Sequence, residues 1–116
     1  MHELSIAMSI VDIASGRAEA ADAERVTQVE LDIGTLSGIE FNSLEFALSV
    51  AVKDSLLEGT HFKINRIEAL CECSSCYHLY TPGQDFGACP QCGNRELEFI
   101  RGKELQIKSL LIDQKG

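Results

Sequence analysis

The sequence has few basic residues, no tryptophan and little proline. Its 116 residues include 10 Lys and Arg against 18 Asp and Glu, which gives a formal net charge of −8. Because binding to a phosphate backbone needs clustered Lys and Arg, this balance argues against general binding to nucleic acid. An acidic surface suits a protein that handles cations or docks on a basic partner, although many cytosolic proteins are simply acidic.

The sequence also lacks a long apolar run. No stretch approaches the roughly 20 residues that a helix needs to span a bilayer, so we expect no membrane association. No Lys or Arg precedes the first apolar stretch, and Asp12 and Arg17 interrupt it, which is unlike a secretory signal. We therefore expect a cytoplasmic protein, in which five cysteines are metal ligands rather than disulfides.

A recognisable set of catalytic residues is missing as well. We find no Ser/His/Asp arrangement, no phosphate-binding loop and no convincing pair of carboxylates. The sequence therefore predicts a protein that is not an enzyme.

Apolar periodicity predicts a first helix and a first strand. The helix is expected from Leu4 to about Ala23. Its buried face is expected to consist of a stripe of Leu4, Met8, Val11 and Ser15, with Ala7, Ile10 and Ala14 beside it. Residues 25–35 change period, since Val29, Leu31 and Ile33 alternate with polar residues as in a half-buried strand.

A second helix and two more strands are predicted further along the chain. The pattern predicts Asn42 as the N-cap of the second helix, with Glu45 completing a capping box, and Gly59 as its stop signal. Strands are expected at 61–69 and 104–113, where apolar and polar residues partly alternate. The predicted class is therefore α+β.

Residues 70–102 have a different composition from the rest of the chain. They hold all five Cys, both Pro and both Tyr, and few aliphatic residues. A segment of fewer than roughly 40 residues rarely folds on a hydrophobic core alone and usually needs a metal or disulfides. We predict a subdomain at 70–102, inserted into a domain formed by 1–69 and 103–116.

Two CxxC pairs in this insert predict a zinc site. Cys73 and Cys76 form the first pair, and Cys89 and Cys92 follow after twelve residues. The two-residue spacing lets each turn direct both sulfur atoms at one ion and leaves backbone N–H groups to donate to them. Four thiolates fill a tetrahedral shell, so the zinc is expected to be structural.

Gly93 follows the second pair and permits the left-handed conformation that closes its turn. Tyr77 occupies the equivalent place after the first pair, so we expect that turn to be less regular.

Cys71 lies off the CxxC spacing and is interpreted as a spare thiol on the same strand face as Cys73. His78 and His61 are interpreted as exposed side chains.

Iron is an alternative metal for four cysteines, as in rubredoxin. That fold normally has glycine after both CxxC pairs and dense aromatic packing around the iron, and this chain has one such glycine and few aromatic residues. Four acidic against two basic residues between 70 and 101 also argue against a ribbon that binds nucleic acid.

His2 is a candidate ligand for a second metal. At a free N-terminus it can present imidazole Nδ1, its own backbone nitrogen and a neighbouring nitrogen in one plane, an arrangement that Ni(II) accepts well. The bulk of His2 also favours retention of Met1. Since a histidine near an N-terminus is more often simply solvated, the residues alone leave both interpretations open.

Four features together resemble the HypA/HybF family of hydrogenase maturation nickel chaperones over nearly the full chain. They are Met1-His2-Glu3-Leu4-Ser5 opening a helix, Leu36-Ser37-Gly38-Ile39-Glu40 before the second helix, the turn Glu58-Gly59-Thr60, and the paired CxxC insert. The resemblance implies two helices on a three-stranded sheet with an inserted zinc ribbon.

The resemblance also implies a function and its residues. His2 would anchor nickel, Glu3 would tune or join that site, and the cysteines at 73, 76, 89 and 92 would hold zinc. Glu40 stands where the family often has an acidic residue. The implied role is delivery of Ni(II) to the large subunit of a [NiFe]-hydrogenase, with a nickel-handling GTPase as partner. The alternatives are a zinc-ribbon interaction module without nickel transfer and a rubredoxin-like redox protein.

Overall fold

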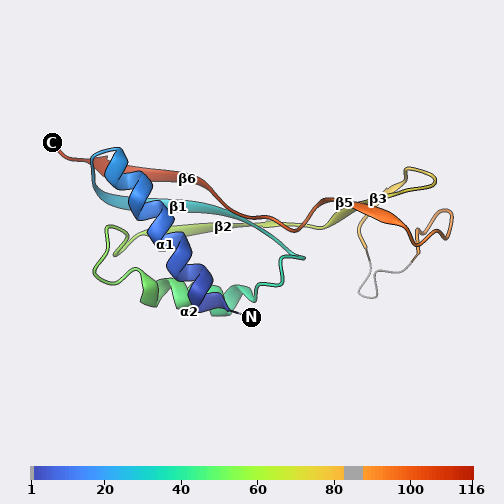
Figure 1. Ribbon diagram of the computed structural model, residues 1–116, viewed down its shortest axis with the longest axis horizontal. Coiled ribbons are helices and arrows are strands. Elements are labelled where there is room, and N and C mark those ends of the chain that lie inside the picture. Colours follow the sequence, from blue (N-terminus) through green and yellow to red (C-terminus); the bar gives the residue numbers. More distant parts are fainter. Residues whose placement is uncertain (1, 83–87) are drawn as a thin grey trace. The chain divides into compact units, whose positions relative to one another are not determined.

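The computed structural model describes residues 2–82 and 88–116. Its elements follow the chain in this order: α1 (Glu3–Ala20), β1 (Ala23–Gly34), α2 (Phe41–Ala51), β2 (His61–Ile67), β3 (Leu70–Cys73), β4 (Leu79–Tyr80), β5 (Leu97–Arg101) and β6 (Leu105–Gln114) (Figure 1). The class is α+β, as the sequence predicts. No helix in the described ranges is long and apolar enough to cross a membrane.

The chain divides into two compact units. The first comprises Met1–Asp32, Gly38–Asn65 and Gln106–Gly116, and the second comprises Ile33–Ser37 and Arg66–Leu105. Each unit contains most of one three-stranded sheet, with order β2-β1-β6 in the first and β4-β3-β5 in the second.

β1 is the central strand of the first sheet, and its burial follows the predicted alternation. Val29, Leu31 and Ile33 are all fully buried. Both helices lie on the same side of this sheet (Figure 1), so the apolar residues of β1 face a helical layer. The prediction of a half-buried strand is confirmed.

α1 buries Val11 of the predicted stripe, but not Leu4 or Met8. Leu4 and Met8 are 53% and 54% exposed, and the buried positions are Ala7, Ile10, Val11, Ala14 and Ala18. The flanking residues Ala7, Ile10 and Ala14 form the centre of the buried face, because alanine lets the helix approach its neighbours closely. The helix also ends earlier than predicted, at Ala20, where Asp22 adopts φ 58° before β1 begins.

α2 begins with an unexpected cap. Glu40 is its N-cap, and its carboxylate oxygens accept hydrogen bonds from the backbone N–H groups of Asn42 at 3.2 Å and Ser43 at 2.6 Å. The prediction of Asn42 as N-cap is wrong, because the longer carboxylate side chain of Glu40 reaches those N–H groups first. The helix ends at Ala51, and Gly59 instead adopts φ 80° in the turn before β2.

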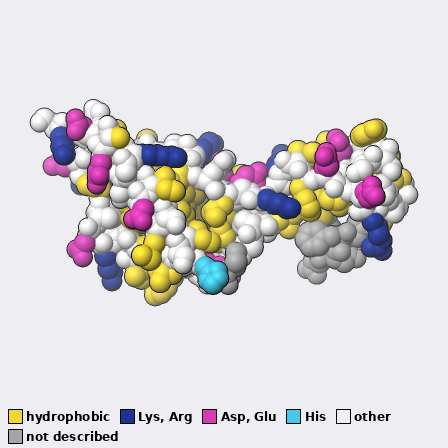
Figure 2. Space-filling model, viewed as in Figure 1, with side chains coloured by type: hydrophobic (Ala, Val, Ile, Leu, Met, Phe, Trp, Pro, Cys, Tyr) yellow, Lys and Arg dark blue, Asp and Glu magenta, His cyan; other side chains and the backbone are white. Residues whose placement is uncertain are grey.

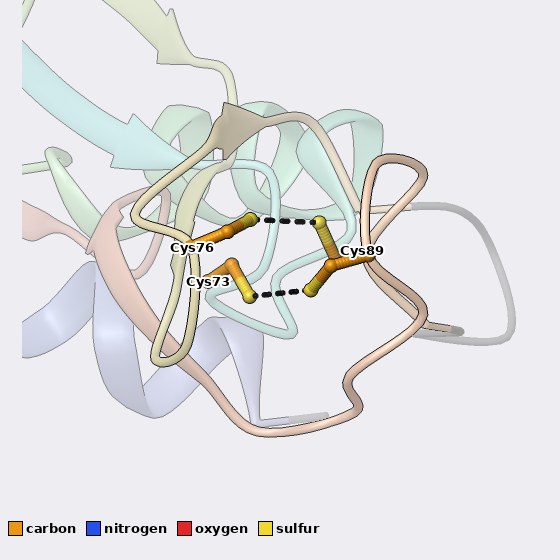
Figure 3. A group of neighbouring side chains, drawn as sticks. Cys73, Cys76 and Cys89 are labelled. Atoms are coloured by element: carbon orange, nitrogen blue, oxygen red, sulfur yellow. Dashed lines mark hydrogen bonds between the residues drawn. The ribbon is translucent and has the colours of Figure 1, made fainter.

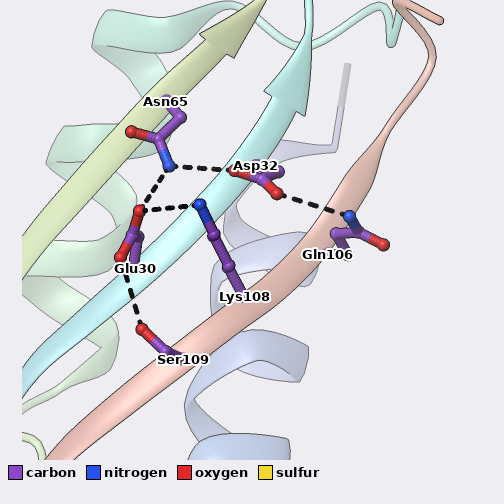
Figure 4. Close-up of polar contacts among 6 residues, drawn as sticks. All are labelled: Glu30, Asp32, Asn65, Gln106, Lys108 and Ser109. Atoms are coloured by element: carbon purple, nitrogen blue, oxygen red, sulfur yellow. Dashed lines mark hydrogen bonds and ion pairs between the residues drawn. The ribbon is translucent and has the colours of Figure 1, made fainter.

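The other face of the first sheet is polar (Figure 4). Nδ2 of Asn65 donates to Glu30 at 2.7 Å and to Asp32 at 2.9 Å. Glu30 also accepts from Ser109 at 3.3 Å and pairs with Lys108 at 3.6 Å. The hydrogen bond from Asn65 lowers the pKa of Glu30 despite partial desolvation. This sheet therefore has one apolar face, under the helices, and one hydrogen-bonded polar face.

The second sheet is antiparallel and brings the cysteines of β3 to one face. Cys71 pairs with Tyr80 of β4 and with Phe99 of β5, and Cys73 pairs with Leu97. Cys71, Cys73, Tyr80 and Cys89 form a small buried cluster against which Leu97 packs. This core is too small to stabilise the segment by itself, in keeping with the need for a metal.

Candidate metal centres

The four cysteines of the CxxC pairs come together in the second unit. Their sulfur atoms all lie within 4.8 Å of one another. Sγ of Cys73 is 3.4 Å from Sγ of Cys92, and Sγ of Cys76 is 3.7 Å from Sγ of Cys89 (Figure 3). Each short contact thus joins one turn to the other, so the two CxxC turns face each other.

This arrangement fits a tetrahedral zinc ion. Four sulfur atoms at about 2.3 Å from zinc stand about 3.8 Å from one another, close to the observed separations. Four thiolates leave no position for water, which suits a structural site and not a catalytic one. The first cysteine of each pair is buried and the second is exposed, so the cluster lies at the edge of the ribbon core.

The two CxxC turns have the same backbone geometry. The N–H group of Tyr77 donates to the carbonyl of Cys73 at 3.0 Å, as Gly93 does to Cys89 at 2.9 Å. Tyr77 adopts φ 61° and Gly93 adopts φ 80°. The prediction of a less regular first turn is wrong, because Tyr77 takes up the left-handed conformation that a glycine would adopt there.

We expect Tyr77→Gly to raise the stability of the zinc-loaded ribbon by about 1 kcal/mol. Tyr77 is 71% exposed, so the substitution loses little packing and relieves a positive φ. Chemical denaturation of the zinc-loaded variant measures the change, with Ser74→Gly in the same turn as control. A variant less stable than the parent would show that the exposed ring contributes more than the strain costs.

Backbone N–H groups donate to the first sulfur of each turn, as the spacing predicts. Ser75 donates to Sγ of Cys73 and Gln91 to Sγ of Cys89, both at 3.4 Å. Hydrogen bonds from the backbone N–H group of Cys76 and then of Ser75, opposed by burial, lower the pKa of Cys73 to about 6. These donors thus favour the thiolate form of Cys73, the form in which a cysteine binds a metal.

Cys71 lies outside the four-sulfur cluster, although it is fully buried beside it. Burial raises the pKa of its thiol, which favours the neutral form over the thiolate that would ligate zinc. Its place in the apolar cluster is typical of a cysteine that packs as a small hydrophobic side chain.

Substituting Cys71→Ser is expected to leave one zinc ion bound and to lower stability by about 1–3 kcal/mol, because a hydroxyl replaces a buried thiol. Metal analysis of the purified protein measures the zinc, and denaturation of the loaded form measures the stability. Cys71→Ala, which introduces no polar group, is the matched control. Loss of zinc from both variants would place Cys71 among the ligands.

His78 and Tyr80 form a stacked pair next to the cluster. Their ring centroids are 6.0 Å apart with an interplanar angle of 10°. His78 is half-buried, so the prediction of an exposed His78 is wrong; stacking on Tyr80 covers it. His61 is exposed on β2, as predicted.

His2 stands at the start of the first unit. It is the N-cap residue of α1, its side chain is exposed, and it makes no side-chain capping bond. Its carbonyl accepts from the N–H group of Ile6 at 3.0 Å, which fixes the backbone on the helical side. Met1, whose retention the sequence favours, lies outside the described residues.

An open groove adjoins His2 between the N-terminal turn of α1 and α2. It is lined by His2, Glu3, Leu4, Ser5, Ser43, Phe46, Ala47 and Val50. Phe46 is 72% exposed, and hydrophobic side chains gather over α2 (Figure 2).

Oε2 of Glu3 accepts from the backbone N–H group of Glu40 at 3.2 Å. The periodicity of the sequence did not reveal this contact, because it joins residues 37 positions apart.

The fold and these centres define a small α+β protein with a ribbon whose four clustered cysteines fit a metal ion, and with a histidine at its N-terminal helix. The family model "Hydrogenase/urease nickel incorporation, metallochaperone, hypA" matches residues 1–112. The Hydrogenase maturation factor HypA of Parabacteroides distasonis is 43% identical over 112 residues, which cover 97% of each chain. That of Chlorobium phaeobacteroides is 38% identical, covering 97% of this chain and all of the other.

Solved structures agree on the fold. The solution structure of the nickel metallochaperone HypA from Helicobacter pylori is similar with a TM-score of 0.71 and 24% identity, covering 99% of this chain and 100% of that one. A second HypA solution structure gives a TM-score of 0.73 at 23% identity, covering 99% and 98%. The chain belongs to the HypA family of nickel metallochaperones for hydrogenase maturation. The rubredoxin-like and bare zinc-ribbon alternatives are not favoured.

Proposed function

We propose that this protein carries Ni(II) at its N-terminus and delivers it to the large subunit of a [NiFe]-hydrogenase. The observation that carries the proposal is the placement of His2, exposed and uncapped, at the first turn of α1 in a chain of the nickel-incorporation family. A planar set of imidazole and backbone nitrogens suits Ni(II). An exposed site at a chain end also lets an acceptor reach the ion, as transfer requires.

The two metals have separate tasks in this proposal. Cys73, Cys76, Cys89 and Cys92 hold Zn(II), which stabilises a ribbon at 70–102 with almost no apolar core. His2 anchors the nickel cargo on the domain formed by 1–69 and 103–116, and Glu3 assists it. Neither centre performs catalysis, so we propose that the protein is not an enzyme.

The proposed partners follow from the pathway of the family. They are the hydrogenase large subunit as nickel acceptor and a nickel-handling GTPase, both in the cytoplasm. Neither nucleic acid nor membrane is a proposed partner. The acidic net charge of −8 favours partners whose docking surfaces are basic.

Reconstituted transfer tests the proposal. The zinc-loaded protein carrying one Ni(II) is mixed with the metal-free precursor of a [NiFe]-hydrogenase large subunit, with and without the GTPase and GTP. After separation by size, nickel is expected with the precursor while zinc stays with the donor. His2→Ala protein given the same nickel is the control. Equal transfer by this variant, or transfer no faster than from free Ni(II), would contradict delivery.

A further inference from the structure

Two glutamates join the N-terminal ends of the two helices. Glu3 is the first residue of α1, and Glu40 immediately precedes α2. The carboxylate of Glu3 accepts from the backbone N–H group of Glu40 at 3.2 Å, and that of Glu40 accepts from Asn42 and Ser43. Each carboxylate lies at a helix N-terminus, where the helix dipole favours negative charge.

The bond from Glu3 acts on the backbone next to His2. Glu3 follows His2 directly, so a fixed Glu3 restricts the backbone that carries the imidazole and the neighbouring amide nitrogens. The anchoring point is itself ordered, because Glu40 caps α2 and α2 packs on α1. Without this bond, the first turn of α1 would fray, as helix ends ordinarily do.

Resting on the proposed nickel function, we propose that Glu3 is a positioning residue of the nickel site and not a nickel ligand through its side chain. Its carboxylate orders the first turn of α1 against the cap of α2, and thereby presents the nitrogens at His2 in one arrangement. Oε2 of Glu3 cannot ligate nickel while it accepts from the Glu40 N–H group. Ligation through Oε1 would shift the ligand-field absorption of bound nickel when Glu3 is replaced. The two roles left open by the family resemblance, tuning and joining, are therefore separable by experiment.

Three substitutions of Glu3 distinguish these roles. Glu3→Gln keeps an acceptor of the same reach without the charge. Glu3→Asp keeps the charge but withdraws the acceptor by one methylene group, and Glu3→Ala removes both. Glu45→Ala, which removes an exposed carboxylate from α2, is the control for general charge effects. Zinc content and the helical circular dichroism of each variant report that the fold is kept.

Titration of each zinc-loaded variant with Ni(II) gives the first readout. We expect the nickel affinity of the Glu3→Gln protein to lie within about twofold of the parent's. The Glu3→Asp and Glu3→Ala proteins are expected to bind nickel about tenfold more weakly, as is usual when a group that orients metal ligands is lost. The ligand-field absorption of bound nickel is expected to keep its position in all variants. Equal losses in Gln and Ala, or an Asp variant that binds like the parent, would assign the effect to the charge and overturn the proposal.

Hydrogen exchange of the Glu40 amide gives a second readout that needs no nickel. Protection of this amide from exchange is expected to persist in the Glu3→Gln protein and to fall in the Glu3→Asp and Glu3→Ala proteins. Unchanged protection in the Glu3→Ala protein would show that the bond does not order this region. Lost protection with unchanged nickel affinity would show that the ordering does not serve the site. Failure of the proposed function itself is distinguished by His2→Ala, which would then bind nickel normally.

Discussion

His2→Ala is expected to abolish specific nickel binding and to leave zinc content and fold intact. The imidazole of His2 is the one neutral nitrogen donor among the side chains of residues 1–16, so no local side chain replaces it. The zinc cluster depends on thiolates alone. As an exposed N-cap residue without a side-chain capping bond, His2 is expected to affect stability by no more than about 0.5 kcal/mol. Nickel titration and metal analysis measure the two effects separately.

A matched control sharpens this result. His61→Ala removes an exposed histidine from β2 in the same unit and is expected to bind nickel like the parent. A His2→Ala protein that still takes one nickel with parental affinity at neutral pH would contradict the proposed site and favour a zinc-ribbon module without a nickel role.

Cys89→Ala is expected to release zinc and to disorder the ribbon at 70–102. Structural zinc in small modules contributes on the order of 10–16 kcal/mol of apparent folding free energy. The buried cluster of Cys71, Cys73, Tyr80 and Cys89 cannot replace that contribution. The first unit has its own core, which includes Ile10, Leu31 and Leu44, so the helices are expected to persist. Zinc stoichiometry and limited proteolysis measure the change.

Cys71→Ser is the matched control for this prediction, because it alters a buried thiol that lies outside the four-sulfur cluster. It is expected to keep its zinc and a protease-resistant ribbon. Full zinc stoichiometry in Cys89→Ala, with protection from protease, would show that the metal does not hold the ribbon together. Loss of the helical signal in that variant would show that the two units fold as one.

Strong local patterns predicted the fold best. The alternation of Val29, Leu31 and Ile33 identified the central strand, and the paired CxxC spacing identified the cysteines that meet. The order of helices and strands followed from the same patterns. These features depend on neighbours in the sequence, so they could be inferred without knowledge of the tertiary contacts.

Errors arose where a tertiary contact or an unusual backbone conformation decided the outcome. The buried face of α1 is centred on alanines because close packing outweighs side-chain hydrophobicity there, which leaves Leu4 and Met8 exposed. Glu40 caps α2 in place of Asn42 because its side chain can reach the first free N–H groups. Tyr77 adopts a conformation that favours glycine because the CxxC turn imposes it.

Nickel titration of the zinc-loaded protein, with its native N-terminus and with a Gly-Ser extension before Met1, tests the central claim most directly. The extension keeps His2 and the zinc cluster and moves the terminal amine away. We predict one nickel ion per native chain, held in a planar nitrogen site with its characteristic absorption, and weaker binding with an altered spectrum in the extended chain. Identical affinity and spectra in the two proteins would contradict a site built on the chain terminus.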